Sequence, residues 1–206
     1  MKTNYQVRYA AHPEDAKHYD TKRIRRDFLI ESVFTVDEVN MVYSVYDRMI
    51  VGGAMPVTEQ LTLEAIDPLK STYFTTRREI GIFNVGGEGY VKVGDETFEL
   101  GYKEALYIGR GERNVIFCSK DGKTPAKFYF NSCTAHTAYP CRKVTKADAI
   151  TTSMGEQATS NERNINKMIV SQVLPTCQLQ MGMTELSIGS VWNTMPAHVH
   201  SRRMEA

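Results

Sequence analysis

Several features that would restrict the function of this 206-residue sequence are missing from it. No apolar run approaches the ~20 residues that a membrane-spanning helix requires. The first residues, MKTNYQVRYAAHPEDAKHYD, lack the apolar segment of a secretory signal. The four cysteines include no Cys-x-x-Cys pair, so we expect free thiols in a reducing compartment. These absences predict a cytoplasmic protein that does not associate with membranes.

An excess of charge of either sign is also missing. The chain has 25 Lys and Arg residues against 24 Asp and Glu, and the two signs are interspersed. A nucleic-acid-binding protein would need a basic patch, so we expect no nucleic-acid partner. A small acidic substrate is not excluded, because one or two arginines can bind it.

The last absence is that of long segments with helical periodicity. Short runs rich in Val, Ile, Tyr and Phe instead alternate with turns that contain glycine. This pattern is typical of an all-β sandwich or barrel. Only residues 21–28, TKRIRRDF, could begin a short helix. The hydrophobic fraction of 42% is sufficient for a packed core.

The β-rich runs fall into two parts with a polar stretch between them. Residues 1–139 are predicted to form a barrel-like domain with an N-terminal extension, and residues 168–206 the first part of another. Residues 140–167 contain few strand formers. We interpret them as a linker or crossover, with a short helix at residues 145–150, TKADAI.

One short pattern occurs in both β-rich parts. In each copy a strand-like run is followed by Met-Pro and later by two arginines and a glutamate. The first copy contains Met55-Pro56 with Arg77, Arg78 and Glu79. The second contains Met195-Pro196 with Arg202, Arg203 and Glu205. Only the second copy contains His-x-His, whereas the first has Val57 and Glu59 at the matching places. We interpret the repeat as the duplication of one barrel, of which only the C-terminal copy kept metal ligands.

The C-terminal sequence NTMPAHVHSRRMEA contains a candidate metal site. In a strand, residues i and i+2 lie on the same face, about 6.6 to 6.8 Å apart, so His198 and His200 converge. Glu205 would join them if residues 201–204 form a turn. Two imidazoles and a carboxylate suit zinc, iron, manganese, nickel or copper, with positions left open for water or substrate. The alternative is a surface loop that binds no metal.

Other reactive side chains give weaker signals. Arg202 and Arg203 could bind a substrate carboxylate, or they could be solvated or interface charges. The remaining histidines are expected to be surface or hydrogen-bonded structural residues: His12, His18 and His136. The cysteines lie in no recognisable catalytic signature, so we expect them to pack in the core: Cys118, Cys133, Cys141 and Cys177.

His-x-His followed after four residues by Glu is similar to the first half of the cupin metal motif. Longer stretches, among them RREIGIFNVGGEG, SNERNINKMIV and WNTMPAHVHSRRME, resemble the family of 5-keto-4-deoxyuronate isomerases, also called 4-deoxy-L-threo-5-hexosulose-uronate ketol-isomerases. The resemblance extends over essentially the whole chain. It implies tandem cupin-like β-barrels, of which the first lacks metal ligands.

The resemblance also implies a cofactor and an assembly. One zinc ion per subunit would be bound by His198, His200 and Glu205, together with a further histidine beyond residue 206. The 39 residues from 168 to 206 are too few to close a barrel, so we expect the second barrel to be truncated and this chain alone could be inactive. A homo-hexamer is implied as well.

The implied activity is an aldose–ketose isomerisation of pectin degradation, between 5-dehydro-4-deoxy-D-glucuronate and 3-deoxy-D-glycero-2,5-hexodiulosonate. Such a reaction moves a proton between adjacent carbons through an enediol, and a metal ion can stabilise the enediolate. The sequence identifies neither the general acid–base residue nor the substrate-binding residues. Another metal-dependent cupin enzyme, such as a dioxygenase, and a non-catalytic cupin fragment remain alternatives, because His-x-His-x4-Glu alone does not separate them.

Overall fold

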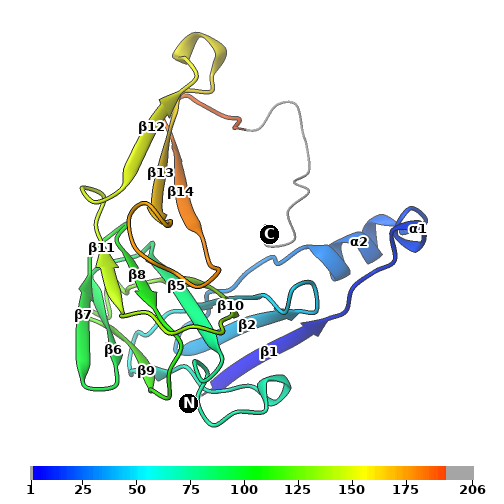
Figure 1. Ribbon diagram of the computed structural model, residues 1–206. Helices are drawn as coiled ribbons and strands as arrows, with labels where there is room; N and C mark the ends of the chain where they lie inside the picture. The colour runs from blue at the N-terminus through cyan, green and yellow to red at the C-terminus, as the bar shows by residue number, and fades with distance from the viewer. Residues whose placement is uncertain (1, 194–206) are drawn as a thin grey trace.

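The computed structural model describes residues 2–193, which form three β-sheets (Figure 1). A seven-stranded sheet has the strand order β1-β2-β3-β10-β5-β8-β11, a four-stranded sheet the order β4-β9-β6-β7, and a three-stranded sheet the order β12-β13-β14. The described helices are short. The prediction of an all-β fold is therefore confirmed.

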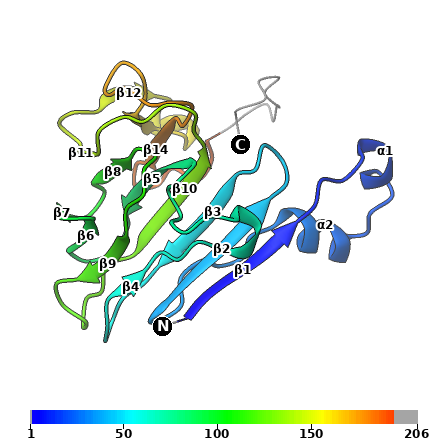
Figure 2. The ribbon, with the colours of Figure 1, turned by 60° about the horizontal axis from the view of Figure 1, so that its bottom comes forward.

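The largest sheet begins with the N-terminal residues. Its strands are β1 (Lys2–Arg8), β2 (Glu38–Ser44), β3 (Ile50–Ala54), β10 (Phe128–Thr134), β5 (Arg78–Asn84), β8 (Ala105–Ile108) and β11 (Arg142–Val144). Strands β1 and β2 are parallel, and a parallel pair requires a crossover connection. The crossover carries α1 (Pro13–Ala16) and α2 (Thr21–Phe28), which project to one side of the sheets (Figure 2). The short helix predicted for residues 21–28 is thus confirmed.

The second sheet closes the other side of the N-terminal core. It consists of β4 (Leu61–Thr62), β9 (Val115–Ser119), β6 (Gly89–Val93) and β7 (Glu96–Leu100), and a short 3-10 helix, Asp67–Leu69, follows β4. A two-residue turn joins β6 to β7, and its Gly94 has φ +59°, a conformation that favours glycine.

Aromatic side chains fill the space between these two sheets. Phe117 of the smaller sheet stacks on Phe128 and Phe130 of β10, with ring centroids 5.3 and 6.0 Å away. All three rings are fully buried. Burial of one such side chain stabilises the fold by roughly 1.5–3 kcal/mol. These rings form the centre of the hydrophobic core between the two sheets.

The central strand β5 is buried on both faces. Ile80 and Ile82 point into the aromatic core, while Phe83 belongs to a second core on the opposite side of the sheet. A side chain at Gly81, which also faces this second core, would approach Sδ of Met181 to 2.3 Å. The close approach shows how tightly the chain after residue 168 packs on β5.

The third sheet extends away from the sandwich (Figure 1). It consists of β12 (Ile150–Met154), β13 (Arg163–Ile169) and β14 (Met181–Leu186), with a 3-10 helix, Gln157–Thr159, between β12 and β13. Residues of β12 are exposed along its whole length, so backbone pairing with β13 rather than apolar burial defines this strand.

Residues 140–167, predicted to be a linker or crossover, therefore contain regular structure. They include β11, β12 and the beginning of β13. The short helix predicted for residues 145–150 is wrong. A turn stands there, in which the Asp148 carboxylate accepts hydrogen bonds from the amide and the hydroxyl of Thr145. Local side chain–backbone bonds of this kind compete with helix formation. The division into two barrels stays a prediction.

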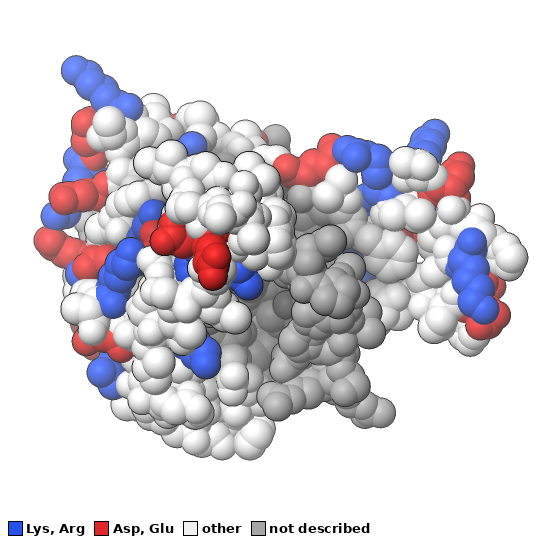
Figure 3. Space-filling model, turned by 90° about the horizontal axis from the view of Figure 1, so that it is seen from above, with Lys and Arg blue, Asp and Glu red and all other residues white. Residues whose placement is uncertain are grey.

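Surface charges of both signs lie next to one another (Figure 3). Lys120, for example, pairs with Glu88 and Glu99, and Lys143 with Glu104. Within the part of the chain that the structure describes, no helix has the length and apolar character needed to cross a bilayer.

An ionic cluster joins the sandwich to the third sheet. Glu185 of β14 forms ion pairs with Lys103 and, at 2.8 Å, with Lys146. Asn166 of β13 donates a further hydrogen bond to the same carboxylate at 2.9 Å. The two lysines, Lys103 first, lower the pKa of Glu185 from its ordinary value of 4.5 to about 2.

We predict that Glu185→Gln lowers the free energy of unfolding at pH 7 by about 1 kcal/mol, as expected for a partly exposed ion pair. Because the folded-state pKa of Glu185 is depressed, its stabilisation is complete above about pH 4.5 and decreases as the pH falls through 2. Urea denaturation at pH 7 and about pH 3 should therefore show that the difference in unfolding free energy between wild type and Glu185→Gln is smaller at the lower pH. Glu112→Gln, at an exposed position, is the control. If the unfolding free energies of wild type and Glu185→Gln differed by the same amount at both pH values, the depressed pKa of Glu185 would be contradicted.

Candidate functional site

The predicted metal ligands His198, His200 and Glu205 lie outside the described residues, as do Arg202 and Arg203. Between residues 2 and 193, no group of three or more His, Cys, Asp and Glu side chains could hold a metal ion. The metal site therefore stays a prediction. The described residues show how the chain that leads to it is held.

A buried carboxylate on β5 holds that chain. Glu79 is 0% exposed, and its two oxygens accept hydrogen bonds from three consecutive backbone amides. The amide of Cys177 donates at 2.8 Å, and those of Gln178 and Leu179 at 2.6 Å. Only Gln180 separates residues 177–179 from the start of β14. We call these three contacts the Glu79 anchor.

Two side chains complete the surroundings of Glu79. The hydroxyl of Tyr107 donates to it at 2.5 Å, and the thiol of Cys133 at 3.5 Å. Burial and then the hydrogen bond to Glu79 raise the pKa of Tyr107, while burial and then the Glu79 charge raise the pKa of Cys133 to about 12. Both groups thus remain protonated donors. With five donors around it, the carboxylate serves as an anchor.

The neighbouring arginines also bind backbone rather than a ligand. Arg78 is buried, and its guanidinium donates to Oγ of Ser132 at 3.0 Å and to the Ser132 carbonyl at 2.7 Å. Burial lowers the pKa of Arg78 to about 10. Arg77 donates to the Leu69 carbonyl at 2.5 Å. The Arg-Arg-Glu triplet of the first copy is therefore structural.

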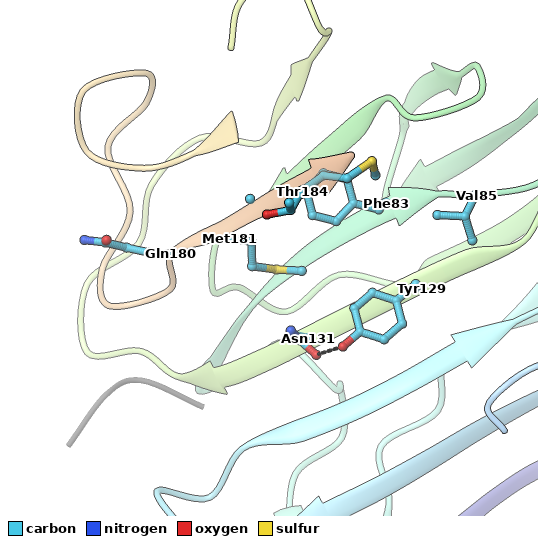
Figure 4. A pocket seen from close by; sticks show the side chains of 9 residues that line it. Phe83, Val85, Tyr129, Asn131, Gln180, Met181 and Thr184 are labelled. Carbon is cyan, nitrogen blue, oxygen red and sulfur yellow. Dashed lines mark hydrogen bonds between the residues drawn. The ribbon is translucent and has the colours of Figure 1, made fainter. Parts of the chain in front are cut away.

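A cavity of about 420 Å³ lies between the sandwich and β14 (Figure 4). Its lining comes from β5, β10 and β14 and the residues next to them: Phe83, Val85, Tyr129, Asn131, Gln180, Met181, Gly182, Met183 and Thr184. The Tyr129 hydroxyl donates to Oδ1 of Asn131 at 2.9 Å. Among the residues that the structure describes, this lining includes no Lys, Arg or His that could pair with a carboxylate.

A thiol and an imidazole meet above the Glu79 anchor. Sγ of Cys177 lies 3.3 Å from Nδ1 of His136. Cys118 and Cys133 are buried, as predicted, whereas Cys141 and Cys177 are only partly buried. Cys177 and His136 are 41 residues apart in the sequence, and no local sequence motif predicts their contact.

The other predicted surface histidines are exposed. Nδ1 of His12 accepts a hydrogen bond from the Glu14 amide at 3.2 Å and so caps α1. His18 lies in the turn after that helix. Neither takes part in a cluster of reactive side chains within residues 2–193.

Comparison with known proteins assigns the chain to a family. The profile of the KduI/IolB family matches residues 28–206. The chain belongs to the KduI/IolB family. Its relatives include 4-deoxy-L-threo-5-hexosulose-uronate ketol-isomerase 1 of Bacteroides thetaiotaomicron, 75% identical over 206 residues, which cover 100% of this chain and 74% of that protein. The ketol-isomerase of Formosa agariphila is 55% identical over 205 residues, covering 100% of this chain and 73% of that protein.

Among solved structures, an IolB-like protein from Salmonella typhimurium LT2 aligns with 62% of this KduI/IolB chain and 46% of its own. The TM-score is 0.46 and the sequence identity 14%, values too low to add to the family assignment. The family resemblance predicted from the sequence is confirmed by the relatives' high identity over the whole chain.

We predict that Glu79→Gln weakens the Glu79 anchor. The new amide group would direct N–H donors at backbone N–H donors, so the free energy of unfolding should fall by about 3 kcal/mol. Amide hydrogen exchange at residues 177–179 should accelerate. Tyr107→Phe removes one donor and keeps the carboxylate, so it should cost only about 1 kcal/mol. Equal exchange rates in wild type and Glu79→Gln would contradict the anchor.

Proposed function

We propose that this chain acts as a 4-deoxy-L-threo-5-hexosulose-uronate ketol-isomerase. It would interconvert 5-dehydro-4-deoxy-D-glucuronate and 3-deoxy-D-glycero-2,5-hexodiulosonate in the degradation of pectin. The observation that carries the proposal is the 75% identity to the Bacteroides thetaiotaomicron ketol-isomerase over all 206 residues. A relative from Bacteroides fragilis with the same activity in its name is 74% identical over the same length.

We also propose that the enzyme uses zinc. The donor set of His198, His200 and Glu205 consists of two imidazoles and one carboxylate, and this set fits catalytic zinc sites, which keep a position open for substrate. When bound, the ion supplies a Lewis acid that polarises the substrate carbonyl. Arg202 and Arg203 are the candidates for binding the substrate carboxylate, because a guanidinium can pair with a carboxylate through two hydrogen bonds.

The described part of the chain contributes positioning. The Glu79 anchor and the Glu185 cluster fix both ends of β14 to the rest of the fold. The proposed ligands follow β14 by fewer than twenty residues. Catalytic groups must stay within about 0.5 Å of their productive geometry, which requires a rigid support. We propose that the sandwich is such a support for His198, His200 and Glu205.

Because these 206 residues cover 74% of the Bacteroides thetaiotaomicron relative, the proposal is tested with this chain extended by the remaining residues of that relative. The purified extended chain is incubated with 5-dehydro-4-deoxy-D-glucuronate, and conversion is followed by NMR. We expect conversion to the hexodiulosonate and zinc bound in elemental analysis. The Bacteroides thetaiotaomicron relative serves as the positive control in the same buffer. A chain that binds zinc and leaves the sugar acid unchanged, while the relative converts it, would refute the proposed activity.

Variants separate the zinc proposal from the activity proposal. His198→Ala, His200→Ala and Glu205→Ala should each reduce zinc affinity by more than the roughly 10- to 100-fold that loss of an outer-shell partner costs. Conversion should decrease in parallel. His18→Ala, which changes an exposed histidine of the N-terminal region, should leave both unchanged. Full zinc content in the His200→Ala variant would show that these residues are not the ligands.

The resemblance that predicted zinc also leads us to propose a homo-hexamer in the cytoplasm. The free state of all four cysteines in the structure is consistent with a reducing compartment. Light scattering on the purified protein should give six times the mass of one chain. A mass equal to one or two chains at micromolar concentration would argue against the hexamer.

A further inference from the structure

The contact between Cys177 and His136 is held in place from both sides. The Cys177 backbone is fixed by its amide hydrogen bond to Glu79 at 2.8 Å. The His136 backbone is fixed by Arg110, whose Nη1 donates to the carbonyls of Ala135 and His136 at 3.2 Å.

A third bond ties the two segments directly to each other. Nε2 of Gln178 donates to the carbonyl of Thr134 at 3.0 Å. The backbone segments that carry the thiol and the imidazole are therefore bound to the fold and to each other. Such preorganisation distinguishes a built pair from two surface residues that happen to touch.

The pair is also accessible. His136 is exposed and Cys177 is only partly buried, so a small molecule in solution can reach the sulfur. The proposed function assigns no role to either side chain. The reactive form of a cysteine is the thiolate, and an adjacent imidazole can take the thiol proton and stabilise the resulting anion.

We propose that Cys177, with His136 as its proton acceptor, is a site of oxidation by hydrogen peroxide. The thiolate sulfur attacks one peroxide oxygen, so that an S–O bond forms and the O–O bond breaks. Sulfur is oxidised by two electrons and the peroxide is reduced. The departing hydroxide takes the proton held by His136 and leaves as water, and the product is a sulfenic acid at Cys177.

The other three thiols differ from Cys177 in their surroundings. Cys118 and Cys133 are buried, and the pKa of Cys133 is raised to about 12 by burial and the nearby Glu79 charge. Cys141 is partly buried and lies 3.3 Å from Nη1 of Arg113, yet burial raises its pKa as well. Cys141 is therefore the matched internal control, since it combines a cationic neighbour with partial exposure.

The test treats the folded chain with hydrogen peroxide in the presence of dimedone, which traps sulfenic acids, and locates the adduct by peptide mass spectrometry. We expect Cys177 to be labelled about tenfold faster than Cys141, as a stabilised thiolate requires. His136→Gln should slow labelling of Cys177 by a similar factor and leave Cys141 unchanged. Cys177→Ser should abolish the dominant adduct.

His18→Gln is the control for loss of an exposed histidine, and it should label like wild type. Circular dichroism verifies that each variant is folded before treatment. Labelling of Cys141 at the same rate as Cys177, no labelling of either residue, or an unchanged rate in His136→Gln would each overturn the proposal. The readout does not depend on isomerase activity, so this proposal and the proposed function can fail separately.

Discussion

The structure depends on one buried carboxylate. An acidic group without solvent is unfavourable unless donors surround it, and Glu79 on the central strand β5 has 0% exposure. The chain supplies three of its donors from residues 177–179, about a hundred positions later. Because the buried Glu79 carboxylate needs hydrogen-bond donors, it fixes the position of residues 177–179 against β5.

The remaining packing between sandwich and third sheet follows from this attachment. Once residues 177–179 lie on β5, the side chains of Leu179 and Met181 cover the outer face of the strand, and the absence of a side chain at Gly81 makes room for them. That face would otherwise be solvent-exposed. A strand buried on both faces is typically a continuous apolar run, and in β5 this run is residues 80–83, preceded by the buried Arg78 and Glu79 and followed by the buried Asn84.

The all-β class, the helix at residues 21–28 and the family could be predicted from the sequence, because each is encoded in residues close together in the chain. Strand β12 could not, since its exposed polar residues gain their structure from pairing with β13. The Glu79 anchor and the Cys177–His136 contact could not be predicted from the sequence either. Their partners are 41 or more residues apart, and a polar residue gives no sequence signal of its distant partner. The predicted zinc ligands lie outside the described residues and stay a prediction.

The neutral cavity beside β14 bears on where the isomerisation takes place. A uronate carries a permanent negative charge, and its recognition in a site shielded from water needs a cation or several donors. The cavity lining offers amides, hydroxyls and apolar side chains without such a cation. Arg78, at the start of β5, and Arg77, which precedes it, are already bound to backbone carbonyls. The described lining of this cavity therefore contains no cationic partner for the substrate carboxylate. In the described part of the chain, the N-terminal sandwich holds residues 177–179 and Glu185, and so fixes the position of β14.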